Sequence, residues 1–117
     1  MQYPKAIGPY SPFREAGDLV FFSGQIPLIP DTGEIPANLQ DQAHQAMKNV
    51  GGVLQAAGLG YEKVIKTTVF LADINDFSAV NEIYAQYFKE PFPARSAVAV
   101  KDLPKGVKLE VEVIAHK

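Results

Sequence analysis

The residues of this chain that could most readily bind a ligand or take part in a reaction are Arg95, Glu110, Glu112 and Tyr10. Arg95 follows a proline and begins an apolar run, where an arginine is rarely buried without a partner. Its planar guanidinium offers a fork of N–H donors that matches a carboxylate or a phosphate. A carboxylate held beside such an arginine can orient or deprotonate a water molecule. Two interpretations stay open here: a structural arginine paired with an internal glutamate, or an anion-binding arginine at the mouth of a pocket.

Other kinds of reactive site find little support. The histidines are His44, on an expected helix, and His116, and neither has a partner at metal-ligand spacing. We expect His44 to be a surface residue, and no Ser-His-Asp triad is expected without a suitably placed histidine. The chain contains no cysteine, which excludes thiolate catalysis, and it has no glycine pattern of a nucleotide-binding loop. We therefore expect no metal site and no nucleotide-binding loop.

Composition and charge restrict the class of partner. The 117 residues are 47% hydrophobic and 21% charged, with a net charge of −2, which is ordinary for one globular domain covering 1–117. We find no basic footprint for nucleic acid, and no polybasic patch or long apolar run for a membrane. The lack of cysteine and of an apolar leader is compatible with a cytoplasmic protein.

Hydrophobic periodicity predicts the elements that position these side chains. Runs of β-prone apolar residues predict strands, and a 3.6-residue apolar period predicts helices. The strands are expected at 19–22, 64–71, 95–101 and 107–115, with a further extended piece at 25–29. The helices are expected at 39–57, between an Asn38 N-cap and a Gly58 stop, and at 77–89.

Several local features refine this prediction. The continuous apolar run 19–22 is typical of a strand covered on both faces, and Gly24 indicates a bulge or a close approach by another group. Gly51-Gly52 is expected to let the first helix pack closely on a sheet. Asn81 lies beside the apolar stripe of the second helix, where it is either an exposed or capping residue or a ligand contact.

The link at 102–106 is expected to form a hairpin-like turn between the last two strands. A five-residue turn would pair 101 with 107 and place Arg95 and Glu110 on opposite faces of the sheet. A four-residue turn would pair 102 with 107 and place them on the same face. The sequence leaves both registers open, and in an oligomer the two side chains could also meet across a subunit boundary.

This element order predicts an antiparallel or mixed sheet with two helices on one face. The other face would then carry the apolar side chains of Phe21, Val98 and Val100. A soluble monomer rarely exposes such a patch, so we expect the sheets to pack against copies of themselves in a closed oligomer.

Short motifs along the chain resemble the Rid (YjgF) family, and most closely the RidA enamine/imine deaminases. The resemblance covers essentially the whole chain in order, and the motifs are specific as a set. They are AIGPYS at 6–11, FSGQIP at 22–27, DF with VN at 76–81, PARS at 93–96, and LPKG at 103–106 leading to EVE at 110–112.

The resemblance implies an α+β, chorismate-mutase-like (YjgF) fold and a homotrimer with sites in the clefts between subunits. It also implies hydrolysis of 2-iminobutanoate and 2-iminopropanoate to 2-oxo acids and ammonia, so the ligand would be a small 2-imino or 2-oxo acid. No cofactor or metal would be needed.

The resemblance also implies roles for individual residues. Arg95 would hold the substrate carboxylate, the backbone carbonyl of Ala97 would face the imine nitrogen, and Glu110 would position the attacking water. Some relatives carry cysteine where this chain has Ala97, but only the backbone is needed there. The residues expected to line the pocket are Tyr10, which would close it, Gly24, Asn81 and Ser23, whose hydroxyl would add a polar group; Glu112 is expected to be structural.

Other functions compete with the deaminase. A non-catalytic trimer that binds small carboxylates or acts like a chaperone would need Arg95 but not Glu110, and both are present. A ribonuclease is disfavoured by the negative net charge and the lack of a histidine pair. A chorismate mutase would share the fold, but fold alone does not give function, and one arginine is little for a dianionic substrate.

Overall fold

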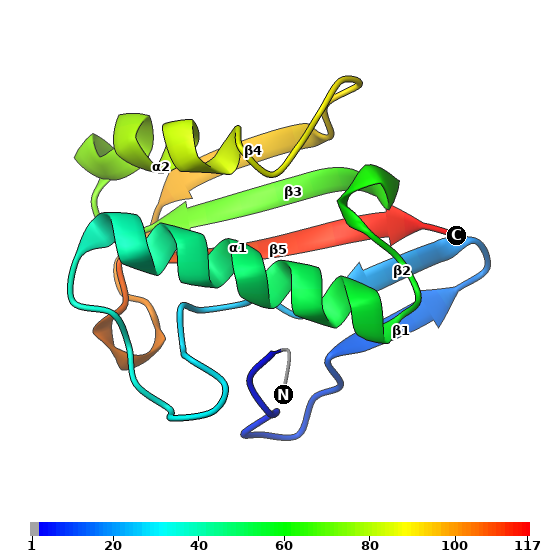
Figure 1. Ribbon diagram of the computed structural model, residues 1–117, viewed down its shortest axis with the longest axis horizontal. Helices are drawn as coiled ribbons and strands as arrows, with labels where there is room; N and C mark the ends of the chain where they lie inside the picture. The colour runs from blue at the N-terminus through cyan, green and yellow to red at the C-terminus, as the bar shows by residue number, and fades with distance from the viewer. Residues whose placement is uncertain (1–2) are drawn as a thin grey trace.

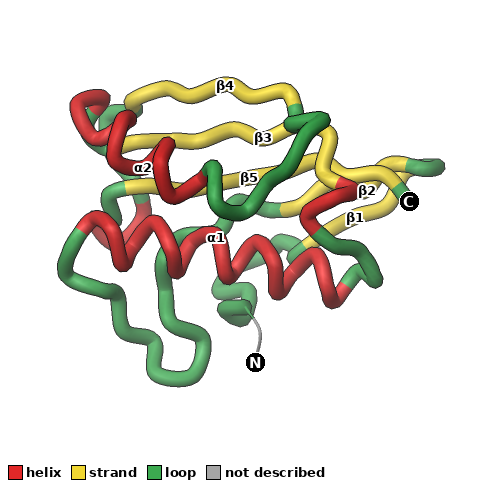
Figure 2. The backbone as a smooth tube through the Cα atoms, turned by 45° about the horizontal axis from the view of Figure 1, so that its top comes forward, coloured by secondary structure: helices red, strands yellow, loops and turns green. Residues whose placement is uncertain are grey.

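A five-stranded mixed sheet carries the fold, and both α-helices cover one of its faces (Figures 1 and 2). The computed structural model describes residues 3–117. The strand order is β1-β2-β5-β3-β4, and neighbours are antiparallel except β3 and β4, which are parallel. The elements are β1 (Phe13–Ala16), β2 (Leu19–Phe22), α1 (Leu39–Ala56), β3 (Val64–Leu71), α2 (Phe77–Tyr84), β4 (Ala94–Ala99) and β5 (Leu109–His116). The predicted mixed sheet with two helices on one face is confirmed.

Helix α1 begins and ends close to its predicted bounds. The Asn38 side-chain oxygen accepts a 2.8 Å hydrogen bond from the Asp41 backbone N–H, and its amide donates to the Asp41 carboxylate at 2.9 Å. This N-cap satisfies one of the free donors of the first turn. At the other end Gly58 has a φ of 76°, a left-handed conformation that stops the helix at low steric cost.

Helix α2 ends at Tyr84, five residues before the predicted end at residue 89. Two successive i→i−3 bonds follow, from Gln86 N–H to the Ile83 carbonyl and from Tyr87 N–H to the Tyr84 carbonyl, both 3.0 Å. They tighten the chain into turns ahead of the proline-rich link to β4. Phe88 is still buried, which is why its apolar spacing resembled a continuing helix.

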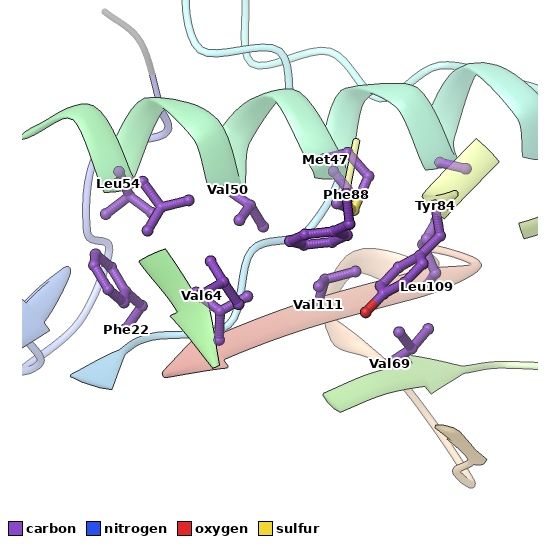
Figure 3. Packing of buried hydrophobic residues seen from close by; sticks show 14 of the residues in the cluster. Phe22, Met47, Val50, Leu54, Val64, Val69, Tyr84, Phe88, Leu109 and Val111 are labelled. Carbon is purple, nitrogen blue, oxygen red and sulfur yellow. The ribbon is translucent and has the colours of Figure 1, made fainter. Parts of the chain in front are cut away.

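The core lies between the helices and the sheet (Figure 3). Met47, Val50 and Leu54 on α1 point toward the sheet, where Leu54 lies close to Phe22, and all three α1 side chains, like Leu109 and Val111 on β5, are at most 2% exposed. Strand β5 alternates, with its buried residues towards the helices. Glu110 and Glu112 therefore lie on the opposite, open face, as the pattern predicted.

The expectation that 19–22 is covered on both faces is wrong for the chain by itself. Val20 and Phe22 are buried, whereas Leu19 is 37% and Phe21 43% exposed. The reason is that both helices lie on one side of the sheet (Figure 1). Ile65 and Val98 are exposed as well, and with Leu19 and Phe21 they form what we call the open-face patch. Val100, which was also expected there, is half-buried.

The predicted hairpin between the last two strands is wrong in both of its registers. Strands β4 and β5 do not pair, because β3 lies between them. The α2 crossover brings β4 alongside β3 in parallel, and β5 then occupies the other edge of β3. The link contains a 3₁₀ turn, Pro104–Gly106, in which Lys105 has a left-handed φ of 56°.

Two helix residues have partners that the sequence did not indicate. The Tyr61 hydroxyl donates a 2.6 Å hydrogen bond to the Met47 carbonyl, and a Cβ at Gly51 would collide with that hydroxyl. Gly51 therefore makes room for Tyr61 rather than for a strand. His44 is not a plain surface residue, because it is half-buried and its Nδ1 lies 2.8 Å from the Tyr87 hydroxyl.

Candidate functional site

Arg95 lies on β4, the outer strand of the sheet, and its side chain is on the helix-covered face. It pairs with Thr67 of β3, which is fully buried beneath the helices. Its guanidinium carbon is 5.2 Å from the ring centroid of Phe77 and 4.9 Å from that of Tyr84. Its Nη1 donates a 2.6 Å hydrogen bond to the Asn81 side-chain oxygen.

One face of α2 supplies all three contacts. Phe77, Asn81 and Tyr84 stand at positions i, i+4 and i+7, which lie above one another on a helix. We call these three residues and Arg95 the arginine cluster. It borders a pocket of about 380 Å³ lined by Asn81, Tyr84, Ala85, Phe92, Pro93 and Arg95.

No carboxylate among residues 3–117 forms an ion pair with Arg95. Its partners are an amide oxygen and two aromatic rings, which are neutral groups. The guanidinium is exposed at the pocket, so its charge is available to an anion. This favours the anion-binding interpretation of Arg95 over that of a structural ion pair within the described chain.

The backbone of β4 also offers polar groups at this edge. The Val100 N–H bonds to the Leu71 carbonyl of β3 at 2.9 Å. Because backbone groups alternate in direction along a strand, those of Ser96 and Val98 also face β3. The N–H and carbonyl of Ala97 therefore face away from β3, toward the edge that no other strand of residues 3–117 occupies.

A second group of predicted residues includes Glu110 on β5 and Gly24, which lies against its carboxylate. Gln25 exchanges two backbone hydrogen bonds with Val111, of 2.8 and 3.0 Å. Between this bridge and the preceding pair, Phe21 with Ile114, three residues (22–24) stand opposite two (112–113). This irregularity is the bulge that the glycine predicted.

Gly24 is needed where the bulge passes Glu110. A Cβ at Gly24 would collide with the Glu110 carboxylate, so only glycine leaves the carboxylate its present place. We call Tyr10, Ser23, Gly24 and Glu110 the glutamate cluster.

The Glu110 carboxylate is an uncompensated charge within this chain. It is half-buried, and no hydrogen-bond donor or cation among the described residues contacts it. Desolvation raises the pKa of Glu110, and the neighbouring Glu112 carboxylate on the same face raises it further. A carboxylate of raised pKa is a stronger base than a free one.

Ser23 and Tyr10 complete the second cluster. The Ser23 hydroxyl donates a 2.7 Å hydrogen bond to the Ser11 carbonyl, and its backbone N–H bonds to the Pro12 carbonyl at 2.9 Å. Ser23 thus ties down the loop that carries Tyr10, and its oxygen can still accept. Tyr10 is 51% exposed and lines one pocket with Ser23 and another with Gly24.

The two clusters lie on opposite faces of the sheet. Arg95 stands opposite Thr67 on the covered face, whereas Glu110 stands opposite Phe70 on the open face. Since paired residues project to the same side, Arg95 and Glu110 cannot meet around one ligand in a single chain. The structure brings Arg95 together with Asn81, and Glu110 with Gly24, but it does not join the two groups.

Phe77, Tyr84 and Thr67 were not predicted as site residues. The first two appeared as part of an apolar helix face, and Thr67 as an ordinary strand residue. The spacing of Phe77, Asn81 and Tyr84 could have indicated a shared face, but not that Arg95 lies beneath it.

Neighbouring features carry no predicted site residue. A pocket of about 520 Å³ adjoins the arginine cluster at Pro93 and is lined mainly by Tyr61, Tyr87, Phe88 and the residues around Glu90. Residues 3–117 hold no group of three or more His, Asp or Glu placed to bind a metal ion. No helix in the described part of the chain is long and apolar enough to cross a membrane.

Comparison with known proteins places this arrangement in a family. The sequence matches the Endoribonuclease L-PSP family over residues 1–117. It is 50% identical to the human 2-iminobutanoate/2-iminopropanoate deaminase over 113 residues, covering 96% of this chain and 82% of that one. The crystal structure of Escherichia coli TdcF with bound serine superposes with a TM-score of 0.94 at 51% identity, covering 99% and 94% of the two chains. RidA from an Antarctic Psychrobacter superposes with a TM-score of 0.95 at 38% identity, with coverage of 99% and 94%.

A chain with this α+β YjgF fold and this extent of identity is a reactive intermediate deaminase by class. The chain belongs to the Rid/YjgF (L-PSP) family, and the resemblance seen in its motifs is confirmed.

Proposed function

We propose that this protein hydrolyses small 2-imino acids, such as 2-iminobutanoate and 2-iminopropanoate, to 2-oxo acids and ammonia, in the cytoplasm. The observation that carries the proposal is Arg95, an arginine with neutral partners at a pocket, in a chain half identical to a deaminase of that name. The substrate has one carboxylate, for which a bidentate arginine is well matched at neutral pH. The serine bound to TdcF likewise carries a carboxylate beside a nitrogen-bearing carbon.

In this proposal the arginine cluster holds and orients the substrate. Arg95 binds the carboxylate with donors that Asn81 leaves free, and the Ala97 carbonyl accepts a hydrogen bond from the protonated imine nitrogen. The nitrogen then keeps its proton, so the C=N carbon stays electrophilic.

The glutamate cluster supplies the water. Glu110 accepts a proton from water as the oxygen bonds to the imine carbon, and the C=N electron pair moves to nitrogen. Glu110 then gives this proton to the carbinolamine nitrogen, and the C–N bond breaks as the electron pair of the O–H bond forms the C=O bond. The freed Glu110 carboxylate accepts the hydroxyl proton and passes it to the departing ammonia, which leaves as ammonium, and the 2-oxo acid remains. Tyr10, Ser23 and Gly24 line the pocket, with Tyr10 closing it.

The proposed site needs two copies of the chain, because the clusters lie on opposite faces of one sheet. We propose a homotrimer in which the arginine cluster of one copy meets the glutamate cluster of the next. The open-face patch, with its four exposed apolar side chains, supports such packing. Sedimentation showing a monomer at micromolar concentration would contradict this assembly.

The test is release of ammonia from freshly generated 2-iminopropanoate by wild type, Arg95→Ala and Lys48→Ala. Lys48 is an exposed cation on α1, outside both clusters. We expect wild type and Lys48→Ala to accelerate release, and Arg95→Ala to lose roughly a hundredfold or more, because charged hydrogen bonds are lost. No acceleration by wild type would reject the deaminase and favour a non-catalytic protein that binds small carboxylates.

A further inference from the structure

We propose that Tyr84 and Thr67 are positioning residues for Arg95, holding its guanidinium in the ligand-binding orientation before the ligand arrives. Neither touches the reacting atoms, and neither was assigned a role by the motifs of the family. This inference rests on the proposed function insofar as the ligand of Arg95 is a small carboxylate, but the ordering of Arg95 can be measured without turnover.

Thr67 and Tyr84 form a buried pair of hydroxyl groups. Thr67 is fully buried and Tyr84 is 7% exposed, and their side-chain oxygens lie 2.8 Å apart. Figure 3 shows the Tyr84 side chain directed from α2 toward the strands, with its hydroxyl oxygen at the far end. A ring anchored at both ends, by the helix backbone and by this hydrogen bond, cannot rotate out of its place.

The Arg95 guanidinium lies against the Tyr84 ring. Arg95 and Thr67 are paired residues of β4 and β3, so the hydroxyl that fixes Tyr84 belongs to the neighbour of Arg95 in the sheet. The guanidinium carbon is 4.9 Å from the centroid of Tyr84, within the range of a cation–π contact. The pairing of β3 with β4 therefore fixes the positions of both Arg95 and the Tyr84 ring against which it lies.

The contact with Tyr84 leaves most N–H donors of Arg95 free for a ligand. An arginine has five N–H donors, and Asn81 uses one donor on Nη1. Aromatic rings engage the guanidinium through its π face and compete for no donor. Burial raises the pKa of Tyr84, which keeps its hydroxyl protonated at neutral pH and the ring without a charge that would compete for Arg95.

Holding Arg95 in place before the ligand binds would favour binding. Arg95 is exposed, on an outer strand, and a free arginine loses much rotamer freedom when it binds a ligand. Order provided in advance lowers that cost, so it improves ligand affinity without changing the chemical step. The expected kinetic signature is therefore a raised KM with an unchanged kcat.

The direct experiment is NMR of the arginine Nε–H groups in the unliganded protein. The chain has two arginines, so Arg14 serves as an internal reference for Arg95. The variants are Thr67→Val, Tyr84→Phe and the double variant, which keep side-chain volume nearly constant. We expect the Arg95 Nε–H to be more ordered than that of Arg14 in wild type, and to lose order in all three variants while Arg14 is unchanged.

The double variant separates positioning from stability. Each single variant leaves one buried hydroxyl without its partner and lowers the melting temperature, whereas removing both groups is close to neutral. If the double variant regains both the melting temperature and the order of Arg95, the hydroxyl pair is only structural and the proposal is overturned.

Ligand affinity gives the second readout. With 2-oxobutanoate as the titrated probe, we expect the dissociation constant to rise roughly three- to tenfold in the variants, the range of one cation–π contact. KM for 2-iminobutanoate should rise by the same factor at constant kcat. Unchanged affinity and unchanged Arg95 order would overturn the positioning role, whereas ordered Arg95 without any turnover by wild type would reject the proposed function alone.

Discussion

The arginine and glutamate clusters differ in how complete they are within one chain. Arg95 has its supports in place: an amide oxygen at 2.6 Å and two rings within 5.2 Å, all from a single helix. Glu110 has a glycine beside it and a like charge two residues away, but no donor or cation among the described residues.

This difference indicates that the two clusters have different roles. A cation held against aromatic rings keeps its position without an anion, which supports our proposal that the arginine cluster is a preformed binding site. A half-buried carboxylate without a partner destabilises the fold, so we infer that a group from outside this chain contacts the glutamate cluster in the working protein. In our proposal the missing partner is the arginine cluster of another copy, with substrate and water between them.

The largest expected effect comes from mixing two inactive variants. Arg95→Ala and Glu110→Gln, co-refolded in equal amounts, should regain about one quarter of wild-type activity, since a site between copies is intact with probability 1/2 × 1/2. Either variant alone is the control, together with a mixture made without refolding. No recovery after verified subunit exchange would contradict a site shared between two copies of the chain.

A methyl group at Gly24 should disturb the glutamate cluster without disturbing the fold. In Gly24→Ala the new Cβ displaces the end of the Glu110 side chain, which is flexible, so activity should fall roughly ten- to hundredfold while stability changes little. Gly8→Ala is the matched control, because its Cβ would meet the Tyr10 ring only at 3.5 Å. Equal activity of the two variants in the ammonia-release assay would contradict the role of the Gly24–Glu110 contact.

Glu110 should make the free energy of unfolding depend on pH. Because its folded pKa is raised, the folded protein holds this proton more tightly than the unfolded chain does. The associated stability is fully present below the unfolded pKa and is lost as pH rises through the folded pKa. Urea unfolding across the mildly acidic range should therefore show a smaller loss of stability with rising pH in Glu110→Gln. Glu82→Gln, on the exposed side of α2, should follow wild type.

The smallest expected effect separates the fold from both clusters. Asn38→Ala removes the N-cap of α1 and should cost about 1 kcal/mol of unfolding free energy. Activity per folded molecule should stay at the wild-type level, because Asn38 lies in neither cluster. A parallel loss of activity at a temperature where the variant is fully folded would show that α1 is coupled to the site.

Local chemistry made several parts of this structure predictable. The alternation of β5 placed Glu110 and Glu112 away from the core, Asn38 and Gly58 marked α1, and Gly24 marked a close approach. Each of these depends on neighbours within a few residues in sequence. The end of α2 was mispredicted because the buried Phe88 continues the apolar spacing through residues that form tighter turns.

Family motifs and tertiary structure answered different questions about the site. The motifs named Arg95, Asn81, Gly24 and Glu110 as expected site residues, and family membership is confirmed by the comparisons. They could not say that Phe77 and Tyr84 lie against Arg95, because that depends on how α2 packs over the sheet.

By itself the sequence determined which residues of β5 face the core, where α1 begins and ends, and which side chains could take part in chemistry. These follow from side-chain period, capping and backbone restriction, which are local. Only the tertiary structure decided that β3 lies between β4 and β5, and hence that Arg95 and Glu110 are on opposite faces. Strand order depends on which edges meet after the helices have packed, and no local pattern encodes that choice.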